Sequence, residues 1–287
     1  MNPLQKKLNS QNLATPFIHF VLGSGLSNSF QESQEIKNWK EETSLNFSEI
    51  PEIPDSSVSG HSGQFKIFQH QKLPLCINMQ CGRLHGYEGK SPQEVVSPLL
   101  LAVESGTKNF VLSNASGSLQ KDFHPGHSMI IDDHVNFTGQ TPLYGKNNDQ
   151  LGPRFPDMSE CYSRELNDLL FEETQKQKLS THRGNYVGVS GPSYETPAEV
   201  KLFSSWGIGA VGMSTVWEAI FLAHTQAKHQ TRTAALSLIS NFGTGLIKSD
   251  ESLTHEEVLE AGRVTAPKII DSFLLFAERL FQSEKSQ

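Results

Sequence analysis

Short apolar segments with high β propensity recur along the chain, and most of them run directly into a turn of small or polar residues. We expect strands at residues 17–22, 65–68, 75–79, 109–113, 128–135, 185–190, 210–213 and 234–240. Several helix starts share one pattern, a Ser or Thr followed three residues later by Glu, and they begin at Ser91, Thr196, Thr215 and Thr254. Strand, turn and helix repeated in this order predict an α/β fold.

The length and composition of the chain favour one domain. With 287 residues the chain can bury a large core, and no repeat or linker divides it, so we expect a single domain over residues 1–287. The net charge of −7, without a basic block or tail, argues against a nucleic-acid surface.

The amino terminus and the cysteines predict the compartment. Residues 1–15 are polar and lack the apolar core of a signal peptide, and no apolar run approaches the length of a membrane span. Three cysteines without paired spacing indicate free thiols in a reducing compartment. We therefore expect a cytoplasmic protein without membrane contacts.

The stretch at 80–89, Gln-Cys-Gly-Arg-Leu-His-Gly-Tyr-Glu-Gly, is the most suggestive segment for function. If the chain stays extended after the strand at 75–79, Arg83, His85 and Tyr87 face one way. An Arg fork and a His among glycines form a plausible oxyanion clamp, because the guanidinium can bind a phosphate with two hydrogen bonds. A solvated polar loop is an equal alternative from these residues alone.

Polar residues that directly follow predicted strands extend this site. They are Ser24, Arg83, Asn114, Glu195, Ser214 and Asn241. Ligands of α/β sheets bind at the carboxyl ends of strands, where helix amino termini favour anions. Residues 114–118 are expected to form a turn whose amides could bind an anion. Capping or turn roles are the alternative for the Ser and Asn residues.

The roles of two residues in predicted loops remain open. His61 lies in Ser-Gly-His-Ser-Gly, where it is either a structural or solvated histidine or part of a mobile gate. Phe155 lies in an irregular stretch at 139–157, and a contact with the core is favoured over an exposed anchor.

Several kinds of catalytic site have no support in the sequence. No His-Glu-x-x-His or cysteine cluster occurs, and His224 and His229 are five residues apart, so we expect no metal. No Gly-x-Ser-x-Gly elbow or nucleoside triphosphatase loop is present. An anion clamp with one carboxylate, amides, a hydroxyl and aromatics suits catalysis by positioning and electrostatics.

Along nearly its whole length the chain resembles the trimeric purine nucleoside phosphorylases. The matching motifs, in the family's order, are Gly-Ser-Gly-Leu at 23–26, Gly-His-Ser-Gly at 60–63, Gly-Arg-Leu-His-Gly-Tyr-Glu-Gly at 82–89, Ser-Asn-Ala at 113–115, Arg-Phe-Pro at 154–156, Gly-Pro-Ser-Tyr-Glu-Thr at 191–196, Val-Gly-Met-Ser-Thr at 211–215, Ser-Asn at 240–241 and His-Glu-Glu at 255–257. The resemblance implies a single α/β domain around a mixed, partly barrel-like sheet flanked by helices.

The resemblance also implies roles for individual residues. Phosphate contacts match Ser24, His61, Arg83, His85, the Ala115 amide and Ser214. Ribose contacts match Tyr87, Met213 and His255, and Glu88 matches a partner of His85. Purine contacts match Tyr194, Glu195 and Asn241. The catalytic residues that the resemblance implies are His85, Glu195, Asn241 and His255. Phe155 would reach the active site of a neighbouring subunit, since the family is homotrimeric.

The chain departs from the family at several positions. Cys81 stands where Gln is usual, Ser116 and Ser118 replace smaller residues, and Trp217 replaces Pro. The span from His61 to Arg83 is slightly long, and residues 242–250 diverge. These departures bear on substrate preference more than on activity.

The activity that the resemblance implies is phosphorolysis of inosine and guanosine, with phosphate as co-substrate and no metal or organic cofactor. Two alternatives remain. A 5'-methylthioadenosine phosphorylase shares the scaffold but has an acidic residue where Asn241 stands. A nucleoside-binding regulator without catalysis is the other, and the intact Arg83, His85, Glu195, Asn241 and His255 argue against it.

Overall fold

The computed structural model describes residues 1–23, 26–27, 29–54, 63–247 and 255–286, with side chains of the last segment described from Arg263 onward. The strands are β1 (Ile18–Leu22), β2 (Trp39–Asn46), β3 (Gln64–His70), β4 (Cys76–Cys81), β5 (Asn109–Ser118), β6 (Ser128–Asn136), β7 (Thr181–Gly188), β8 (Ile208–Gly212) and β9 (Arg232–Phe242). The α-helices are α1 (Pro3–Ser10), α2 (Pro92–Val95), α3 (Ser97–Glu104), α4 (Arg164–Lys176), α5 (Pro197–Ser205), α6 (Val216–His229) and α7 (His255–Lys285).

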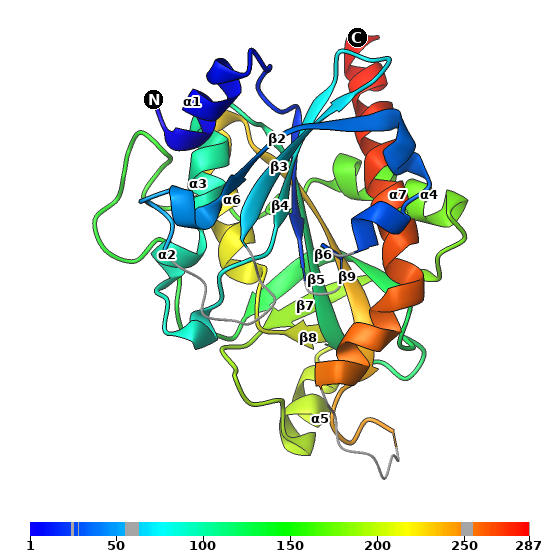
Figure 1. Ribbon diagram of the computed structural model, residues 1–287. Coiled ribbons are helices and arrows are strands. Elements are labelled where there is room, and N and C mark those ends of the chain that lie inside the picture. Colours follow the sequence, from blue (N-terminus) through cyan, green and yellow to red (C-terminus); the bar gives the residue numbers. More distant parts are fainter. Residues whose placement is uncertain (24–25, 28, 55–62, 248–254, 287) are drawn as a thin grey trace.

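Within these residues the strands form one mixed sheet in the order β2-β3-β4-β1-β5-β8-β7-β6-β9. Strand β5 also pairs with β9, so that β5, β8, β7, β6 and β9 close into a small barrel, and β1 to β4 extend from it (Figure 1). The prediction of an α/β fold around a mixed, partly barrel-like sheet is confirmed.

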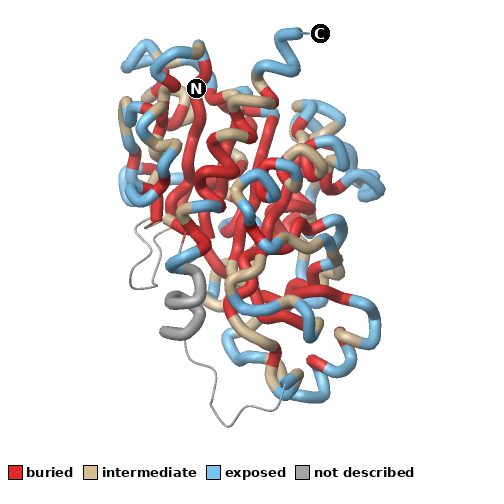
Figure 2. The backbone as a smooth tube through the Cα atoms, turned by 90° about the vertical axis from the view of Figure 1, so that its right-hand side faces the viewer, coloured by how far each residue is buried: buried red, intermediate tan, exposed pale blue. Residues whose placement is uncertain are grey.

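Helices cover both faces of the extended part of the sheet, because the side chains of its strands alternate. In β1, Val21 belongs to the core beneath α3 and α6, whereas Ile18 and Phe20 belong to the core beneath α4 and α7. Figure 1 shows these two pairs of helices on opposite sides of the sheet. The buried segments in Figure 2 run mainly through the strands between them.

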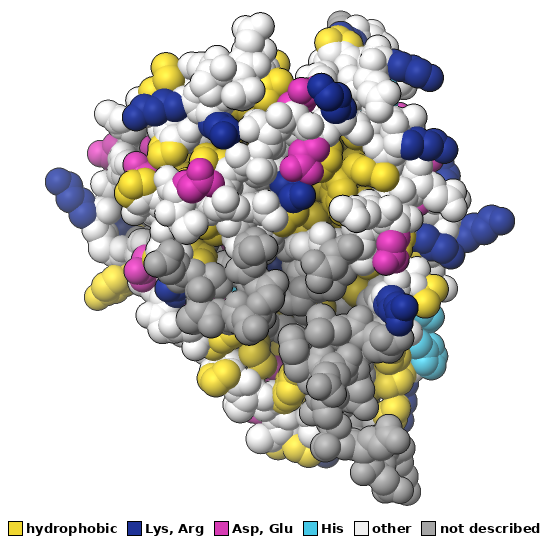
Figure 3. Space-filling view, in the orientation of Figure 1, with side chains coloured by type: hydrophobic (Ala, Val, Ile, Leu, Met, Phe, Trp, Pro, Cys, Tyr) yellow, Lys and Arg dark blue, Asp and Glu magenta, His cyan; other side chains and the backbone are white. Residues whose placement is uncertain are grey.

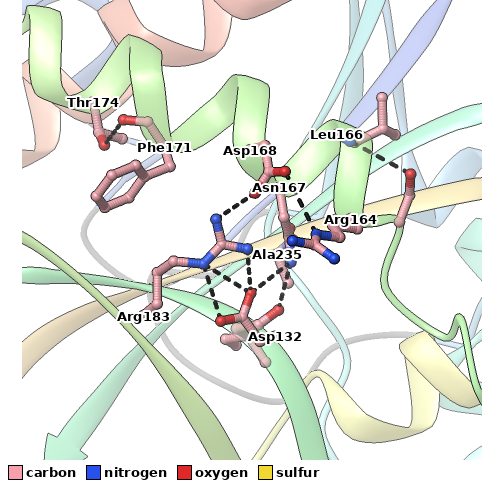
Figure 4. Close-up of polar contacts among 11 residues, drawn as sticks. Asp132, Arg164, Leu166, Asn167, Asp168, Phe171, Thr174, Arg183 and Ala235 are labelled. Carbon is pink, nitrogen blue, oxygen red and sulfur yellow. Dashed lines mark hydrogen bonds and ion pairs between the residues drawn. The ribbon is translucent and has the colours of Figure 1, made fainter.

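A side-chain amide closes the barrel where β6 and β9 separate (Figure 4). The antiparallel pairing of these strands runs from Ser128 with Leu238 to Ile130 with Leu236. One residue further, Asn167 of α4 donates from Nδ2 to the Ile131 carbonyl at 2.9 Å and accepts from the Ala235 amide at 3.2 Å. The amide of Asn167 therefore satisfies two buried backbone groups that the strands no longer offer each other.

An ion-pair network lies outside this seam. Arg183 of β7 contacts Asp132 of β6 at 2.7 Å and Asp168 of α4 at 2.5 Å (Figure 4). These side chains are a third to a half exposed, so the pairs connect α4 to the sheet at modest energetic gain.

The molecular surface carries charges of both signs. On the face seen in Figure 3, Lys and Arg side chains are interspersed with Asp and Glu side chains. Among the described residues, no helix has both the length and the apolar character needed to cross a bilayer.

Every predicted strand is present, with ends that differ by a few residues. The caps at Ser91 and Thr196 are confirmed, because each side chain accepts from the backbone amide three residues later. The capping box predicted at Thr215 is wrong, because Thr215 has a φ of 75° and its side chain makes no capping hydrogen bond. Thr254 lies outside the described residues.

Some elements differ from expectation or were missed. Residues 114–118 do not form a turn but continue β5, because β9 pairs with them along one side and β8 pairs with the last two. The helix expected to run from residue 92 to about 106 is divided into α2 and α3. Helices α1 and α4 and strand β2 had no clear signal in the sequence.

Candidate active site

A pocket lies where the ends of β4, β5, β8 and β9 meet. Its lining is formed by Arg83, His85, Tyr87, Asn114, Ala115, Ser116, Gly117, Tyr194, Glu195, Val211, Gly212, Met213, Ser214, Ser240 and Asn241. Most of the predicted site residues are therefore brought together. Ser24 and His61 lie outside the described residues, as does the side chain of His255, whose backbone begins α7.

The strands that supply this pocket do not all run in one direction. Strand β9 is parallel to β5, but β8 is antiparallel to β5 and overlaps only its last two residues. Because the overlap is so short, Met213 and Ser214 after β8 still reach the residues of β5 that line the pocket. The polar residues that follow these strands therefore converge on the pocket although the strands differ in direction.

Arg83 is fixed by buried partners. Directly after β4, Gly82 has a φ of 97°, a conformation that favours glycine, and the strand ends there. Nε and Nη2 of Arg83 each donate to one carboxylate oxygen of Glu218 at 2.9 Å, and Nη1 donates to the Ser113 carbonyl at 2.7 Å. A guanidinium has five N–H groups, so one on each terminal nitrogen remains for a ligand.

His85 and Tyr87 reach the pocket in a way that the alternation did not predict. The chain is extended at His85 but forms a 3-10 turn, η4, at Gly86–Glu88. The Tyr87 ring stacks on the His85 ring at 4.7 Å. One carboxylate oxygen of Glu88 accepts from the His85 amide at 2.9 Å and lies 3.2 Å from Nδ1, which assigns the ring proton to Nδ1.

Glu195 provides a partly buried carboxylate to the pocket lining. Tyr194 beside it is 42% exposed. Desolvation raises the pKa of Glu195 above its ordinary value, and a backbone hydrogen bond opposes that rise. The carboxylate is thus costly to keep ionised until a donor reaches it.

Asn241 is held by its neighbours near the end of β9. Its Oδ1 accepts from the Ser240 hydroxyl at 2.8 Å, and its Nδ2 donates to the Phe242 carbonyl at 3.0 Å. A Cβ on Gly117 would lie 3.2 Å from Nδ2, so the absence of a side chain there gives the amide its space.

A chain of buried hydrogen bonds supports the pocket floor between β5 and α6. Asn114 donates to the Thr215 hydroxyl at 2.7 Å and accepts from Ser237 at 2.5 Å, and Ser237 lies 2.5 Å from Ser116. A β-branched residue at positive φ is strained, and this contact helps to hold Thr215 between Ser214 and the helix.

Two of these positions were not recognised in the sequence as part of a site. Glu218 was assigned to a capping box with Thr215, whereas its carboxylate binds Arg83 instead. The missed signal is the Arg itself, because a buried guanidinium requires an acidic partner. Ser240 precedes Asn241 and had no separate signal.

Phe155 does not join the core, and the favoured interpretation is wrong. Its side chain is 86% exposed, beside a surface hollow that His134, Met158 and Ile220 also line. Arg154 donates to the carbonyls of Leu143 and Gly145 at 3.0 and 2.9 Å and so shapes the loop. Together with Leu143, Pro156, Met158 and Ile220, Phe155 gives this hollow a mainly apolar lining.

The described side chains contain no group of three His, Cys, Asp or Glu residues arranged to hold a metal ion. All three cysteines are buried and unpaired.

The profile of the phosphorylase superfamily matches residues 21–275. Purine nucleoside phosphorylase 1 of Geobacillus stearothermophilus is 38% identical over 270 residues, which cover 94% of this chain and 92% of that protein. Crystal structures of Schistosoma mansoni purine nucleoside phosphorylase with adenosine and with inosine are 29% and 30% identical, each with a TM-score of 0.81. They cover 96% of this chain and 97% and 96% of theirs.

Isoform 2 of the Schistosoma mansoni enzyme, in complex with cytosine and ribose-1-phosphate, superposes with a TM-score of 0.83 at 31% identity. The match covers 96% of this chain and 94% of that one. The family profile, the curated relative and the solved structures each match this chain over most of its length. The chain therefore belongs to the purine nucleoside phosphorylases of the phosphorylase superfamily.

Proposed function

We propose that this protein catalyses the phosphorolysis of 6-oxopurine ribonucleosides and deoxyribonucleosides, with inosine and guanosine as substrates in purine salvage. The observation that carries the proposal is one pocket whose lining combines two chemically distinct sets of groups. Arg83, His85 and Ser214 supply anion-binding groups, and Glu195 and Asn241 supply a purine-reading pair. Similarity to enzymes crystallised with inosine and with ribose-1-phosphate supports the same assignment.

In the proposed reaction, phosphate binds to Arg83, His85, Ser214 and the Ala115 amide, together with Ser24 and His61. Its oxygen attacks C1' of the nucleoside as the bond from C1' to the purine N9 breaks. The electron pair of that bond moves into the purine, which becomes a better acceptor for a proton at N7, while the ribose takes on oxocarbenium character. Bound phosphate stabilises this positive charge before it bonds to C1'.

The Asn241 amide lowers the barrier by donating to the purine as negative charge develops there, and Glu195 holds the base in place. The Glu195 carboxylate accepts the N1 hydrogen of a 6-oxopurine, and the Asn241 amide donates toward N7 or O6. Desolvation raises the pKa of Glu195, so the N1 hydrogen bond compensates a carboxylate that is poorly solvated before binding. Tyr194 lies against the base, and Tyr87, Met213 and His255 contact the ribose.

We further propose a homotrimer in which Phe155 contacts the nucleoside of an adjacent subunit. Phosphate is the only co-substrate, and no metal or organic cofactor takes part. The buried, unpaired cysteines are compatible with a reducing cytoplasm.

A panel of nucleosides assayed with and without phosphate tests the function. Purine release from inosine and guanosine should require phosphate and yield ribose 1-phosphate. Release at an undiminished rate without phosphate would indicate a hydrolase. Preferential cleavage of 5'-methylthioadenosine would indicate the related phosphorylase, and binding without turnover would indicate a regulator.

A further inference from the structure

We infer that Glu218 is a positioning residue of the phosphate site and that it acts through Arg83. The inference rests on the proposed function, since it concerns how the phosphate-binding guanidinium is aimed. Glu218 lies in the first turn of α6, 135 positions from Arg83 in the sequence, and does not line the pocket. Its effect on phosphate must therefore pass through another residue.

The geometry of the pair fixes the plane of the guanidinium. Both oxygens of Glu218 accept from Arg83 at 2.9 Å, through Nε and Nη2, so the carboxylate occupies one edge of the fork. The third bond, from Nη1 to the Ser113 carbonyl at 2.7 Å, fixes the opposite side. Rotation about the terminal bonds of the side chain would break at least one of these contacts.

Burial makes this restraint strong. The side chains of Arg83 and Glu218 are only 3% and 2% exposed. Water cannot replace either partner there, and a buried charge that loses its partner is strongly destabilised. The two remaining N–H groups of Arg83, one on each terminal nitrogen, are therefore held in a fixed direction in a side chain that lines the pocket.

An independent contact shows that the same turn of α6 also supports the segment at 82–89, which carries Arg83 and His85. Trp217 packs against Gly86 so closely that a Cβ there would lie 2.6 Å from the indole ring. Its Nε1 donates to the Thr138 hydroxyl at 2.9 Å. Adjacent residues of one helical turn thus contact the segment that carries Arg83 and His85.

The Glu218→Gln variant tests this role. Gln has one acceptor in place of two and presents an N–H to a donor of Arg83, so the fork loses its fixed plane. The KM for phosphate should rise about tenfold or more, whereas the KM for inosine should change by less than about threefold. Glu218→Asp keeps the charge but shortens the side chain, and it should also raise the phosphate KM.

A matched control distinguishes an effect on the position of Arg83 from the general effect of losing a buried ion pair. Glu173 of α4 is a buried carboxylate that accepts from Lys176 at 2.7 Å and Arg279 at 2.9 Å, remote from the pocket. Glu173→Gln should lower the melting temperature but leave the phosphate KM unchanged. Melting curves for every variant show which of them are folded.

A double-mutant cycle tests whether Glu218 acts through Arg83. In the Arg83→Ala background, Glu218→Gln should cause no further rise in the phosphate KM, because no fork remains to be aimed. Equal effects of Glu218→Gln in both backgrounds would overturn the inference, as would an unchanged or lower phosphate KM in a folded Glu218→Gln or Glu218→Asp variant. A wild-type enzyme that does not require phosphate would instead refute the proposed function.

Discussion

The Ser240 hydroxyl lies 2.8 Å from Oδ1 of Asn241, closer than the 3.1 Å to the Ser116 carbonyl that competes for its one hydrogen, and this contact favours one orientation of the side-chain amide in the pocket. The other end of the amide donates to the Phe242 carbonyl at 3.0 Å, which leaves one N–H for a ligand. Asn241 therefore offers an N–H donor to the purine edge, while its Oδ1 already accepts one hydrogen bond from Ser240. This arrangement complements O6 or N7 of a 6-oxopurine.

We expect inosine to have a kcat/KM about 10⁴-fold or more above that of adenosine. Adenine would place its bare N1 against Glu195 and its amino donor against the Asn241 donor, and each unpaired buried group costs roughly 1–3 kcal/mol. Because the related Schistosoma mansoni enzyme has been crystallised with both nucleosides, turnover rather than binding is the measure.

Asn241→Asp should narrow or reverse that preference, since it replaces a donor with an acceptor while the Ser240 hydroxyl can still donate to it. Steady-state kinetics of both proteins on both nucleosides is the measurement. Equal efficiency of the wild-type enzyme on adenosine and inosine would contradict the assignment of Glu195 and Asn241.

Phe155→Ala should raise the KM for inosine without lowering the melting temperature, because the side chain is 86% exposed in one subunit and contributes little to its core. Tyr144→Ala is a matched control, since Tyr144 is an equally exposed aromatic, 83%, of the same loop. Sedimentation should give a trimer. A fully active monomer, or the same KM change in both variants, would show that Phe155 does not serve a neighbouring site.

Asn167→Leu should lower the free energy of unfolding by about 2–5 kcal/mol, because it leaves the Ile131 carbonyl and the Ala235 amide buried without partners. Asp168→Asn, one residue along the same helix, removes only exposed ion pairs, with Arg183 and Arg164, and should cost less than about 1 kcal/mol. Denaturant titration of both variants provides the comparison, and equal losses would show that the barrel seam does not depend on Asn167.

The buried His19 should make stability dependent on pH. Its Nδ1 accepts from Asn78 at 3.0 Å and its Nε2 donates to Gln80 at 3.1 Å, which suits the neutral ring. Desolvation lowers the pKa of His19 to about 4, against the opposing effect of the hydrogen bond that His19 donates to Gln80. Between pH 6.5 and 4 the unfolded chain binds a proton that the folded protein excludes, so this contribution to stability is complete above 6.5 and is lost as the pH falls.

The loss over that window is about 3 kcal/mol. The advantage of wild type over His19→Gln in unfolding free energy should therefore shrink between pH 7 and pH 4.5. Subtracting the variant removes the contribution of the other histidines. A difference that does not change with pH would show that His19 is not neutral and buried in the folded protein.

Local interactions made much of the fold readable from the sequence. The predicted strands are present because apolar, β-prone segments between turn residues have few other options, and the caps at Ser91 and Thr196 form because their partners lie three residues away. Of the six polar residues that follow those strands, five line the pocket, namely Arg83, Asn114, Glu195, Ser214 and Asn241.

Partners far apart in the sequence were decided only by the tertiary structure. Residues 114–118 resemble a turn, but pairing with β9 and β8 makes them strand. In the sequence Glu218 resembles part of a capping box, but in the structure its carboxylate accepts two hydrogen bonds from the buried Arg83. The sequence by itself determined most of the strand segments, though not β2, and the polar groups that follow them. Strand direction, barrel closure and the pairing of buried charges depend on which surfaces exclude water together, and only the assembled chain decides that.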